Sequence, residues 1–201
     1  MSFILSIIMP VWNQEKLVLR ALDSIPERKD IETIVINDCS DDKTLPVLEV
    51  YKRASTNNIR IINNLERLRV GKSINKGLDV AKGRYILQLD SDDYLSNEAN
   101  SFIDLLYNLD YDLIFFNNQI NNGDIWRPQM MNGLCDHICL YKKDIIGDTR
   151  HSDAKWGTGW NYHQTILAKQ HTEYFSNILL YHYNFPRKDS NYDLGRRGLL
   201  D

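Results

Sequence analysis

Short runs of β-branched and other apolar residues alternate with helical patterns through the first half of this 201-residue chain. Four runs have the length and composition of buried strands, and they cover residues 3–9, 31–36, 59–63 and 85–89. Helical patterns near residues 15–24, 43–53 and 71–81 separate them. This alternation predicts βαβ crossovers and therefore an α/β fold with a mainly parallel central sheet flanked by helices. Ligands of such sheets bind beyond the carboxyl ends of the strands.

An Asp-Ser-Asp-Asp segment follows the fourth run, at residues 90–93. Successive side chains of an extended chain point to opposite sides, so Asp90 and Asp92 can converge on one ion while Ser91 points elsewhere. Carboxylate oxygens are hard ligands for Mg²⁺ or Mn²⁺, and Mg²⁺ completes its shell with water and substrate phosphates. A second interpretation stays open, because Asp and Ser before an apolar-periodic stretch commonly cap a helix.

Length and composition favour one ordinary globular domain over residues 1–201. Charged residues make up 25% of the chain, hydrophobic residues 43%, and the formal charge is -3, so no basic field indicates nucleic-acid binding. The apolar N-terminus lacks a basic flank and a cleavage site, and it is far shorter than the roughly 20 residues that span a bilayer. We therefore expect no transmembrane segment.

Three cysteines, Cys39, Cys135 and Cys139, are an odd number and fit no disulfide framework. This favours a reducing, cytoplasmic location. Cys135, His137 and Cys139 are close enough in sequence to suggest zinc, but the chain offers no distant second pair of ligands. We do not expect a zinc site.

Three polar segments stand at predicted strand exits, at residues 10–13, 37–42 and 90–93. They resemble, with their flanking residues, the family 2 glycosyltransferases of the GT-A fold, which is Rossmann-like. The resemblance is carried by SIIMPVWN at 6–13, IVINDCSDDKT at 34–44 and the stretch from GKSINKG at 71–77 to DSDD at 90–93. It implies a nucleotide-sugar-binding half over residues 1–118, and an acceptor-side half with a C-terminal tail over 119–201.

By this resemblance the chain would transfer a sugar from a nucleotide diphosphate sugar to an unidentified acceptor hydroxyl. Pro10, Val11 and Trp12 would line the nucleobase pocket, and Asp38 would hydrogen-bond the base. An apolar wall with one carboxylate acceptor suits the imide N–H of uracil. The resemblance implies that this base is most often uracil, so a UDP-sugar donor is expected ahead of GDP- or dTDP-sugars.

The resemblance also implies roles at the phosphate end of the donor. Asp90 would contact the ribose or the metal, with Ser91 beside it at the donor, and Asp92 would bind the Mn²⁺ or Mg²⁺ that bridges the diphosphate. Arg69 and Lys72 fall where family members place base-contacting or phosphate-facing groups. A solvated helix entrance is the alternative for both.

The general base of the family is missing from its usual place. Inverting members commonly carry an acidic pair at a helix start before a late aromatic strand, yet residues 156–164 contain no Asp or Glu. Asp153 and His163 are the candidate bases for an inverting direct displacement. The other possibilities are a retaining enzyme and an inactive relative.

Other residues of the second half have both a structural and a functional interpretation. A histidine flanked by tyrosines, such as His182, packs more often than it ligates a metal. We expect Trp126 in the core and Trp156 or Trp160 in an acceptor loop.

Two other functional classes remain at this stage. One is a module that binds a nucleotide or glycan without turnover. The other is a nucleotidyltransferase, which would also use metal and diphosphate chemistry but would consume a nucleoside triphosphate.

Overall fold

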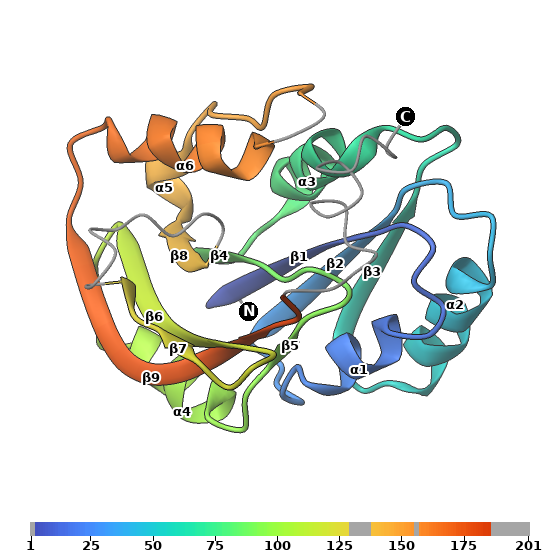
Figure 1. Ribbon diagram of the computed structural model, residues 1–201, viewed down its shortest axis with the longest axis horizontal. Coiled ribbons are helices and arrows are strands. Elements are labelled where there is room, and N and C mark those ends of the chain that lie inside the picture. Colours follow the sequence, from blue (N-terminus) through green and yellow to red (C-terminus); the bar gives the residue numbers. More distant parts are fainter. Residues whose placement is uncertain (1–2, 129–137, 155–156, 186–201) are drawn as a thin grey trace.

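The computed structural model describes residues 3–128, 138–154 and 157–185, which form a curled sheet flanked by helices (Figure 1). The strands are β1 (Leu5–Val11), β2 (Ile31–Asn37), β3 (Asn58–Asn63), β4 (Tyr85–Gln88), β5 (Tyr94–Leu95), β6 (Leu113–Ile120), β7 (Ile125–Trp126), β8 (Cys139–Lys142) and β9 (Glu173–Tyr183). The helices are α1 (Val18–Asp23), α2 (Thr44–Ala54), α3 (Arg69–Val80), α4 (Ala99–Leu106), α5 (Lys143–Ile146) and α6 (Thr158–Leu167). Among the described residues, no helix combines the length and hydropathy needed to cross a membrane.

The described strands follow the order β3-β2-β1-β4-β8-β6-β9-β5, with β7 paired to β6. β1 pairs in parallel with β2 and β4, and β2 pairs in parallel with β3, as the alternating pattern predicts. β8 is antiparallel to β4 and β6, whereas β9 is parallel to β6 and antiparallel to β5. The four adjacent parallel strands β3, β2, β1 and β4 therefore come from the first half of the chain, and the second half adds one further parallel pair, β6 with β9.

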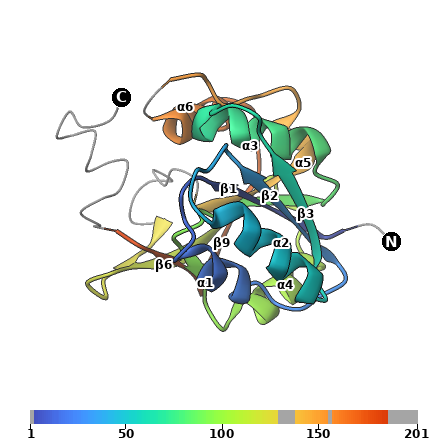
Figure 2. The same ribbon diagram turned by 90° about the vertical axis from the view of Figure 1, so that its right-hand side faces the viewer.

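The helices form two layers around the parallel strands. α3, α5 and α6 lie on one side of the sheet, and α1, α2 and α4 lie on the other (Figures 1 and 2). α1 and α2 lead outward from β1 to β3, whereas α3 leads back past β1 to β4. Since βαβ crossovers are right-handed, this reversal places α3 on the opposite face from α1 and α2.

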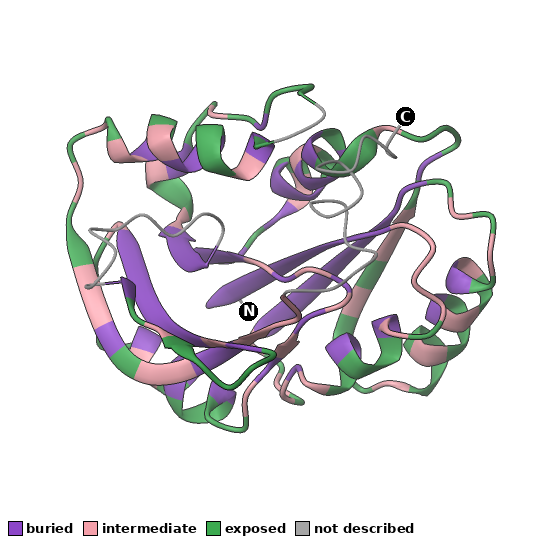
Figure 3. Ribbon diagram, in the orientation of Figure 1, coloured by how far each residue is buried: buried purple, intermediate pink, exposed green. Residues whose placement is uncertain are grey.

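The core lies along the central parallel strands. Every residue of β1 and β2 is buried, as expected for parallel strands covered on both faces (Figure 3). Gly77 of α3 packs directly on these strands, because a Cβ atom there would lie 2.5 Å from Ile8 Cγ2 and 3.1 Å from Ile36 Cδ1. This close approach explains why a glycine stands at this position.

The helix-cap interpretation of residues 90–93 is wrong. Strand β5 follows the segment, and α4 begins only at Ala99 with Glu98 at its N-cap position. The carboxylate of Asp93 instead accepts hydrogen bonds from residues of β9 and the loop after it. The acidic segment is therefore a turn between two strands.

Replacing Gly77 by valine tests this packing. The added methyl groups would overlap Ile8 in the centre of the sheet, and such overpacking costs about 1–3 kcal/mol. We expect urea denaturation to show that loss for Gly77→Val. The exposed Lys52 of α2 provides a control, because Lys52→Ala should change stability by less than about 0.5 kcal/mol. A Gly77→Val protein as stable as the parent would contradict the packing.

Candidate functional site

The carboxyl ends of β1, β2 and β4 meet at one edge of the sheet. Val11 pairs in register with Asn37, and the backbone N–H of Asp38 donates to the Val11 carbonyl over 2.8 Å. On the other side of β1, the N–H of Leu89 donates to the Ile8 carbonyl over 3.0 Å. The three polar strand exits that the sequence singles out therefore lie next to one another.

The loops after β1 and β2 fix each other through side-chain caps. The N–H of Gln14 donates to Thr44 Oγ1 over 2.8 Å, and the N–H of Glu15 donates to Asp42 Oδ2 over 3.1 Å. A turn precedes the helix, with the N–H of Leu17 bonded to the Gln14 carbonyl over 3.1 Å, and α1 begins at Val18, slightly later than the sequence pattern predicts. Asp42 therefore serves to shape the loop.

Backbone strain is concentrated at this edge. The described non-glycine residues with positive φ are Asn13 (51°), Cys39 (58°) and Arg69 (70°). Each follows β1 or β2 or begins α3, and each adopts a conformation that L-residues rarely occupy. Such strain is often found at functional sites, where the surrounding contacts maintain it.

Asp38 is buried, with 4% of its surface exposed, and its carboxylate organises the entry to α3. Oδ1 accepts from Asn64 Nδ2 and from the N–H of Leu68, both at 2.8 Å, and Oδ2 accepts from the N–H of Arg69 at 2.7 Å. An ionised carboxylate offers about four lone-pair sites. Three internal donors leave Oδ2 with capacity for one N–H of a ligand.

Asn64 belongs to the same network, although the sequence analysis did not select it. Its amide nitrogen also donates to Ser73 Oγ over 3.2 Å, and its amide oxygen accepts from Lys76 Nζ over 2.8 Å. The residue is 1% exposed. The sequence could have identified Asn64, because it directly follows β3 and so stands at a fourth polar strand exit.

The predicted apolar wall of the site differs in exposure along its length. Pro10 and Val11 are buried within β1, whereas Trp12 is half-buried beyond the end of the strand. The guanidinium of Arg67 lies 3.5 Å from the centroid of the Trp12 ring, in a cation–π contact. Trp12 is therefore the member of the wall with the largest accessible surface, and Arg67 is a neighbour that the sequence pattern did not identify.

The turn at residues 90–93 separates its carboxylates. Asp90 and Asp92 are half-buried, whereas Ser91 and Asp93 are buried. Asp93 is turned inward, because its Oδ2 accepts from the hydroxyl of Tyr181 over 2.7 Å and its Oδ1 from the N–H of Asn184 over 2.8 Å. Burial, followed by the charges of Asp90 and Asp92, raises the pKa of Asp93 to about 7.

Two accessible carboxylates suit a cation that takes further ligands from a substrate. Within residues 3–128, 138–154 and 157–185, no group of three or more His, Cys, Asp and Glu side chains is assembled for a metal ion. Mg²⁺ is commonly held by one or two carboxylates together with waters and substrate phosphates. The donor set of Asp90 and Asp92 fits this mode of binding.

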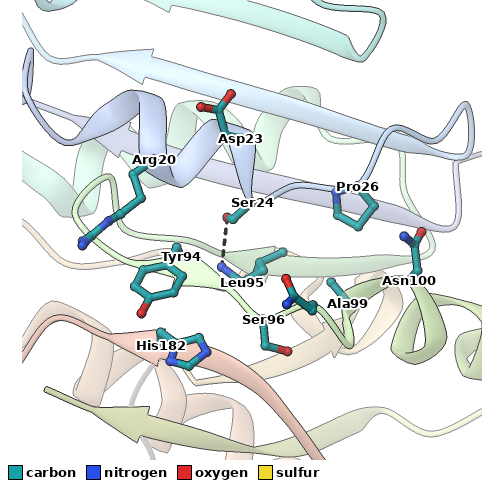
Figure 4. Close-up of a pocket in the computed structure, with 11 residues that line it drawn as sticks. Arg20, Asp23, Ser24, Pro26, Tyr94, Leu95, Ser96, Ala99, Asn100 and His182 are labelled. Carbon is teal, nitrogen blue, oxygen red and sulfur yellow. Dashed lines mark hydrogen bonds between the residues drawn. The ribbon is translucent and has the colours of Figure 1, made fainter. Parts of the chain in front are cut away.

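A pocket of about 690 Å³ lies beside this turn (Figure 4). Arg20 and Tyr94 line it together with His182, whose ring stacks on Tyr94 with centroids 4.5 Å apart. The pocket continues between α1 and the start of α4, where Ser24 Oγ accepts the N–H of Leu95 over 2.9 Å. It borders the acidic turn but includes none of the predicted base-binding residues.

One face of α3 holds a segment from the second half of the chain. The contacts are Lys72 Nζ with Asp153 Oδ2 (2.9 Å), Asn75 with both backbone groups of His151 (2.9 Å each) and Asp79 Oδ1 with Arg150 Nη2 (2.9 Å). Spacings of three and four residues place the three α3 side chains on one helix face. The close approach also explains Gly71, where a Cβ would lie 2.7 Å from the Ser152 carbonyl.

This packing brings only one of the two candidate bases to the site. Asp153 is exposed and reaches the first turn of α3, where Arg69 and Lys72 are also exposed. His163 is fully buried in the core, with Nδ1 2.8 Å from the hydroxyl of Tyr141. The position of His163 is that of a structural side chain, so Asp153 is the better candidate.

Most other aromatic and histidine side chains of the second half are packed. His151 stacks on Tyr162 with centroids 4.1 Å apart, and Trp126 contacts the rings of Tyr183 and Phe185. Trp160, by contrast, is 41% exposed on α6. The candidates Cys135, His137 and Trp156 lie outside the described residues.

Comparisons with known proteins agree with this architecture. The model of the family described as Glycosyl transferase family 2 matches residues 6–195. A poly(ribitol-phosphate) beta-glucosyltransferase of Bacillus spizizenii is 37% identical over 99 residues, which is 47% of this chain and 16% of that protein.

Two solved structures are also similar. TarS 1-349 of S. aureus in complex with UDP-GlcNAc has a TM-score of 0.76 and 22% identity over 94% of this chain and 60% of its own. The mannosyltransferase PcManGT of Pyrobaculum calidifontis in complex with GDP-Man and Mn²⁺ has a TM-score of 0.74 and 14% identity, over 94% of this chain and 59% of its own. These likenesses confirm the predicted GT-A fold. This chain spans only part of each relative.

The hydrogen-bond network of Asp38 can be tested without any ligand. Asp38→Ala leaves the amide of Asn64 and the N–H groups of Leu68 and Arg69 without their acceptor, which costs about 1–3 kcal/mol. We expect urea denaturation to detect that loss, while the exposed Asp148→Ala changes stability by less than about 0.5 kcal/mol. Equal stability of the two variants would argue against an organising role for Asp38.

Proposed function

The chain belongs to glycosyl transferase family 2, and we propose that it transfers a sugar from a UDP-sugar to an acceptor hydroxyl. The observation that carries this proposal is the arrangement at the sheet edge, where Trp12 follows β1, Asp38 follows β2 on one side of it, and the Asp90–Asp93 turn closely follows β4 on the other side. A nucleobase needs the first kind of surface, and a diphosphate with its cation needs the second.

The base would bind beside Trp12, with its imide N–H directed to Oδ2 of Asp38. This carboxylate oxygen retains acceptor capacity after its bond to the N–H of Arg69. Pro10 and Val11 form the buried support of this wall. TarS was solved with UDP-GlcNAc and PcManGT with GDP-Man, so similar folds bind both uridine and guanosine diphosphate sugars. Uracil presents one imide N–H, which matches the one acceptor position that the internal donors leave on Asp38, whereas guanine presents N1–H and N2–H₂ together.

Asp90 and Asp92 would hold Mn²⁺ or Mg²⁺, with Ser91 between them at the donor. Such a cation neutralises the charge that develops on a departing nucleoside diphosphate. The PcManGT complex contains Mn²⁺, which supports this assignment by analogy of fold. The positive side chains of Arg69 and Lys72 stand at the start of α3 and would face the base or the phosphates.

The proposed reaction is an inverting direct displacement. An acceptor hydroxyl attacks the anomeric carbon as the bond to the diphosphate breaks, and Asp153 takes the hydroxyl proton. The ion pair of Lys72 with Asp153 supports this role, since it holds the carboxylate at the first turn of the donor-side helix. Residues 1–118 would bind the donor, and residues 119–201 would supply the acceptor side.

A second function is binding of a nucleotide-sugar or glycan without turnover. The observation that favours it is the absence of any acidic residue between Asp153 and Glu173, where inverting relatives usually carry their base. Measurement of UDP release from a UDP-sugar distinguishes the two functions, because only an enzyme produces free UDP.

Asp92→Asn tests the metal assignment. Loss of one carboxylate ligand should lower kcat for UDP release by at least about 100-fold. Mutation of residues that only orient metal ligands already lowers metal affinity or activity by about 10–100-fold. UDP-glucose and UDP-GlcNAc with Mn²⁺ are the substrates for the assay. The exposed Asp124→Asn is a matched control and should keep full activity. Unchanged kcat in Asp92→Asn would refute the assignment.

Asp153→Asn tests the base. A general base contributes about 10²–10⁴-fold, so kcat should fall by that factor while the Kd for UDP stays unchanged. Asp148→Asn, an exposed aspartate five residues earlier, should retain wild-type kcat. Wild-type chain that binds UDP tightly but releases none from any donor would instead favour the binding-only function.

A further inference from the structure

Tyr181 holds both ends of the acidic turn with one hydroxyl group. The hydroxyl oxygen accepts the backbone N–H of Asp90 over 3.2 Å, and the hydroxyl proton is donated to Asp93 Oδ2 over 2.7 Å. The N–H of Asp93 closes the turn onto the Asp90 carbonyl over 3.0 Å. Tyr181 therefore fixes the backbone of the first residue and the side chain of the last.

The position of this hydroxyl is itself well defined. Tyr181 is completely buried, its ring stacks on Phe116, and its backbone pairs in register with Leu95 of β5. Two residues beyond the end of this pairing, the N–H of Asn184 donates to Asp93 Oδ1 over 2.8 Å. The second half of the chain thus supplies a rigid support for a turn that belongs to the first half.

Arg20 holds the same turn from helix α1. Its guanidinium donates to the backbone carbonyl of Asp92 and lies over the ring of Tyr94, 4.7 Å from the centroid. Tyr94 stacks in turn on His182, and Figure 4 shows the three side chains in one stack beside the pocket. Arg20 therefore contacts the main-chain carbonyl of Asp92 and fixes the backbone at this residue of the turn.

We propose that Tyr181 and Arg20 are positioning residues that set the geometry of Asp90 and Asp92 for the cation and diphosphate. The proposal rests on the proposed function, because it takes these two aspartates as the cation ligands. Tyr181 acts through the main chain of Asp90, and Arg20 through that of Asp92. Outer-shell partners that orient metal ligands typically contribute 10–100-fold to metal affinity.

Tyr181→Phe removes the hydroxyl and keeps the ring. Mn²⁺ binding to the full chain is measured by calorimetry with UDP saturating, and we expect the Kd for Mn²⁺ to rise about 10–100-fold. The matched control is Tyr85→Phe, which removes an equally buried hydroxyl that donates to the Leu109 carbonyl at the other end of β4. The control should keep the wild-type Kd for Mn²⁺.

Arg20→Gln is a second, independent variant. Because Arg20 is exposed, this variant can still test the proposal if Tyr181→Phe does not fold. We expect a weaker effect in the same direction, about tenfold in the Kd for Mn²⁺. Its control is Arg53→Gln, because Arg53 is also exposed and also donates to a backbone carbonyl, that of Glu49 in α2. UDP binding in EDTA should be the same for all four variants, since neither positioning residue contacts the base pocket.

The outcomes separate this proposal from the proposed function. Wild-type chain that binds UDP without taking up Mn²⁺ overturns the metal assignment and this proposal together. Wild-type Mn²⁺ affinity in both Tyr181→Phe and Arg20→Gln overturns the positioning role alone. Weakened Mn²⁺ binding in the two controls as well would show a general loss of stability and would also overturn it.

Discussion

The parallel pairing of β1 with β2 and β4 is the constraint on which the site depends. Parallel neighbours end at the same edge, and strands lie about 4.8 Å apart, so the exits of β2 and β4 are roughly 10 Å apart with the exit of β1 between them. Asp38 follows β2, Trp12 follows β1, and Asp90 closely follows β4. The proposed nucleobase surface and the proposed diphosphate surface are thereby brought together by backbone hydrogen bonds in the buried core.

The same edge is strained, and polar side chains maintain the strain. Asn13, Cys39 and Arg69 have positive φ, which other contacts must stabilise. Asp38 supplies one such contact by accepting the N–H of Arg69. Asp38 consequently orders the start of α3 with part of its lone pairs, and its proposed role toward the nucleobase would use another. Its burial makes both roles precise, because the carboxylate has little freedom to turn.

Local patterns allowed the parallel strands β1 to β4 to be predicted, because each strand and helix in that part of the chain carries its own periodicity. The helix-cap interpretation of the acidic segment failed because the segment is followed by β5, which pairs with β9. This pairing joins residues nearly ninety positions apart, so the local sequence does not predict it. Likewise His163 has the chemistry of a base, but its burial beside Tyr141 is decided by the packing of α6. Asn64 was detectable, since it follows a predicted strand as the other polar exits do.

The division of the chain near residue 118 is a division in sequence and not in space. β9 supports the acidic turn through Tyr181, and the segment around Asp153 is attached to α3, the helix that begins beside Asp38. Both attachments join the later residues to the proposed donor side. In the proposed enzyme, a substitution in the second half would therefore alter donor binding without contacting the donor. A substitution in the proposed acceptor side could likewise change the geometry of the acidic turn. The inward-facing Asp93 makes this coupling strong, because a carboxylate buried beside two others depends on the hydroxyl and N–H that β9 and its following loop provide.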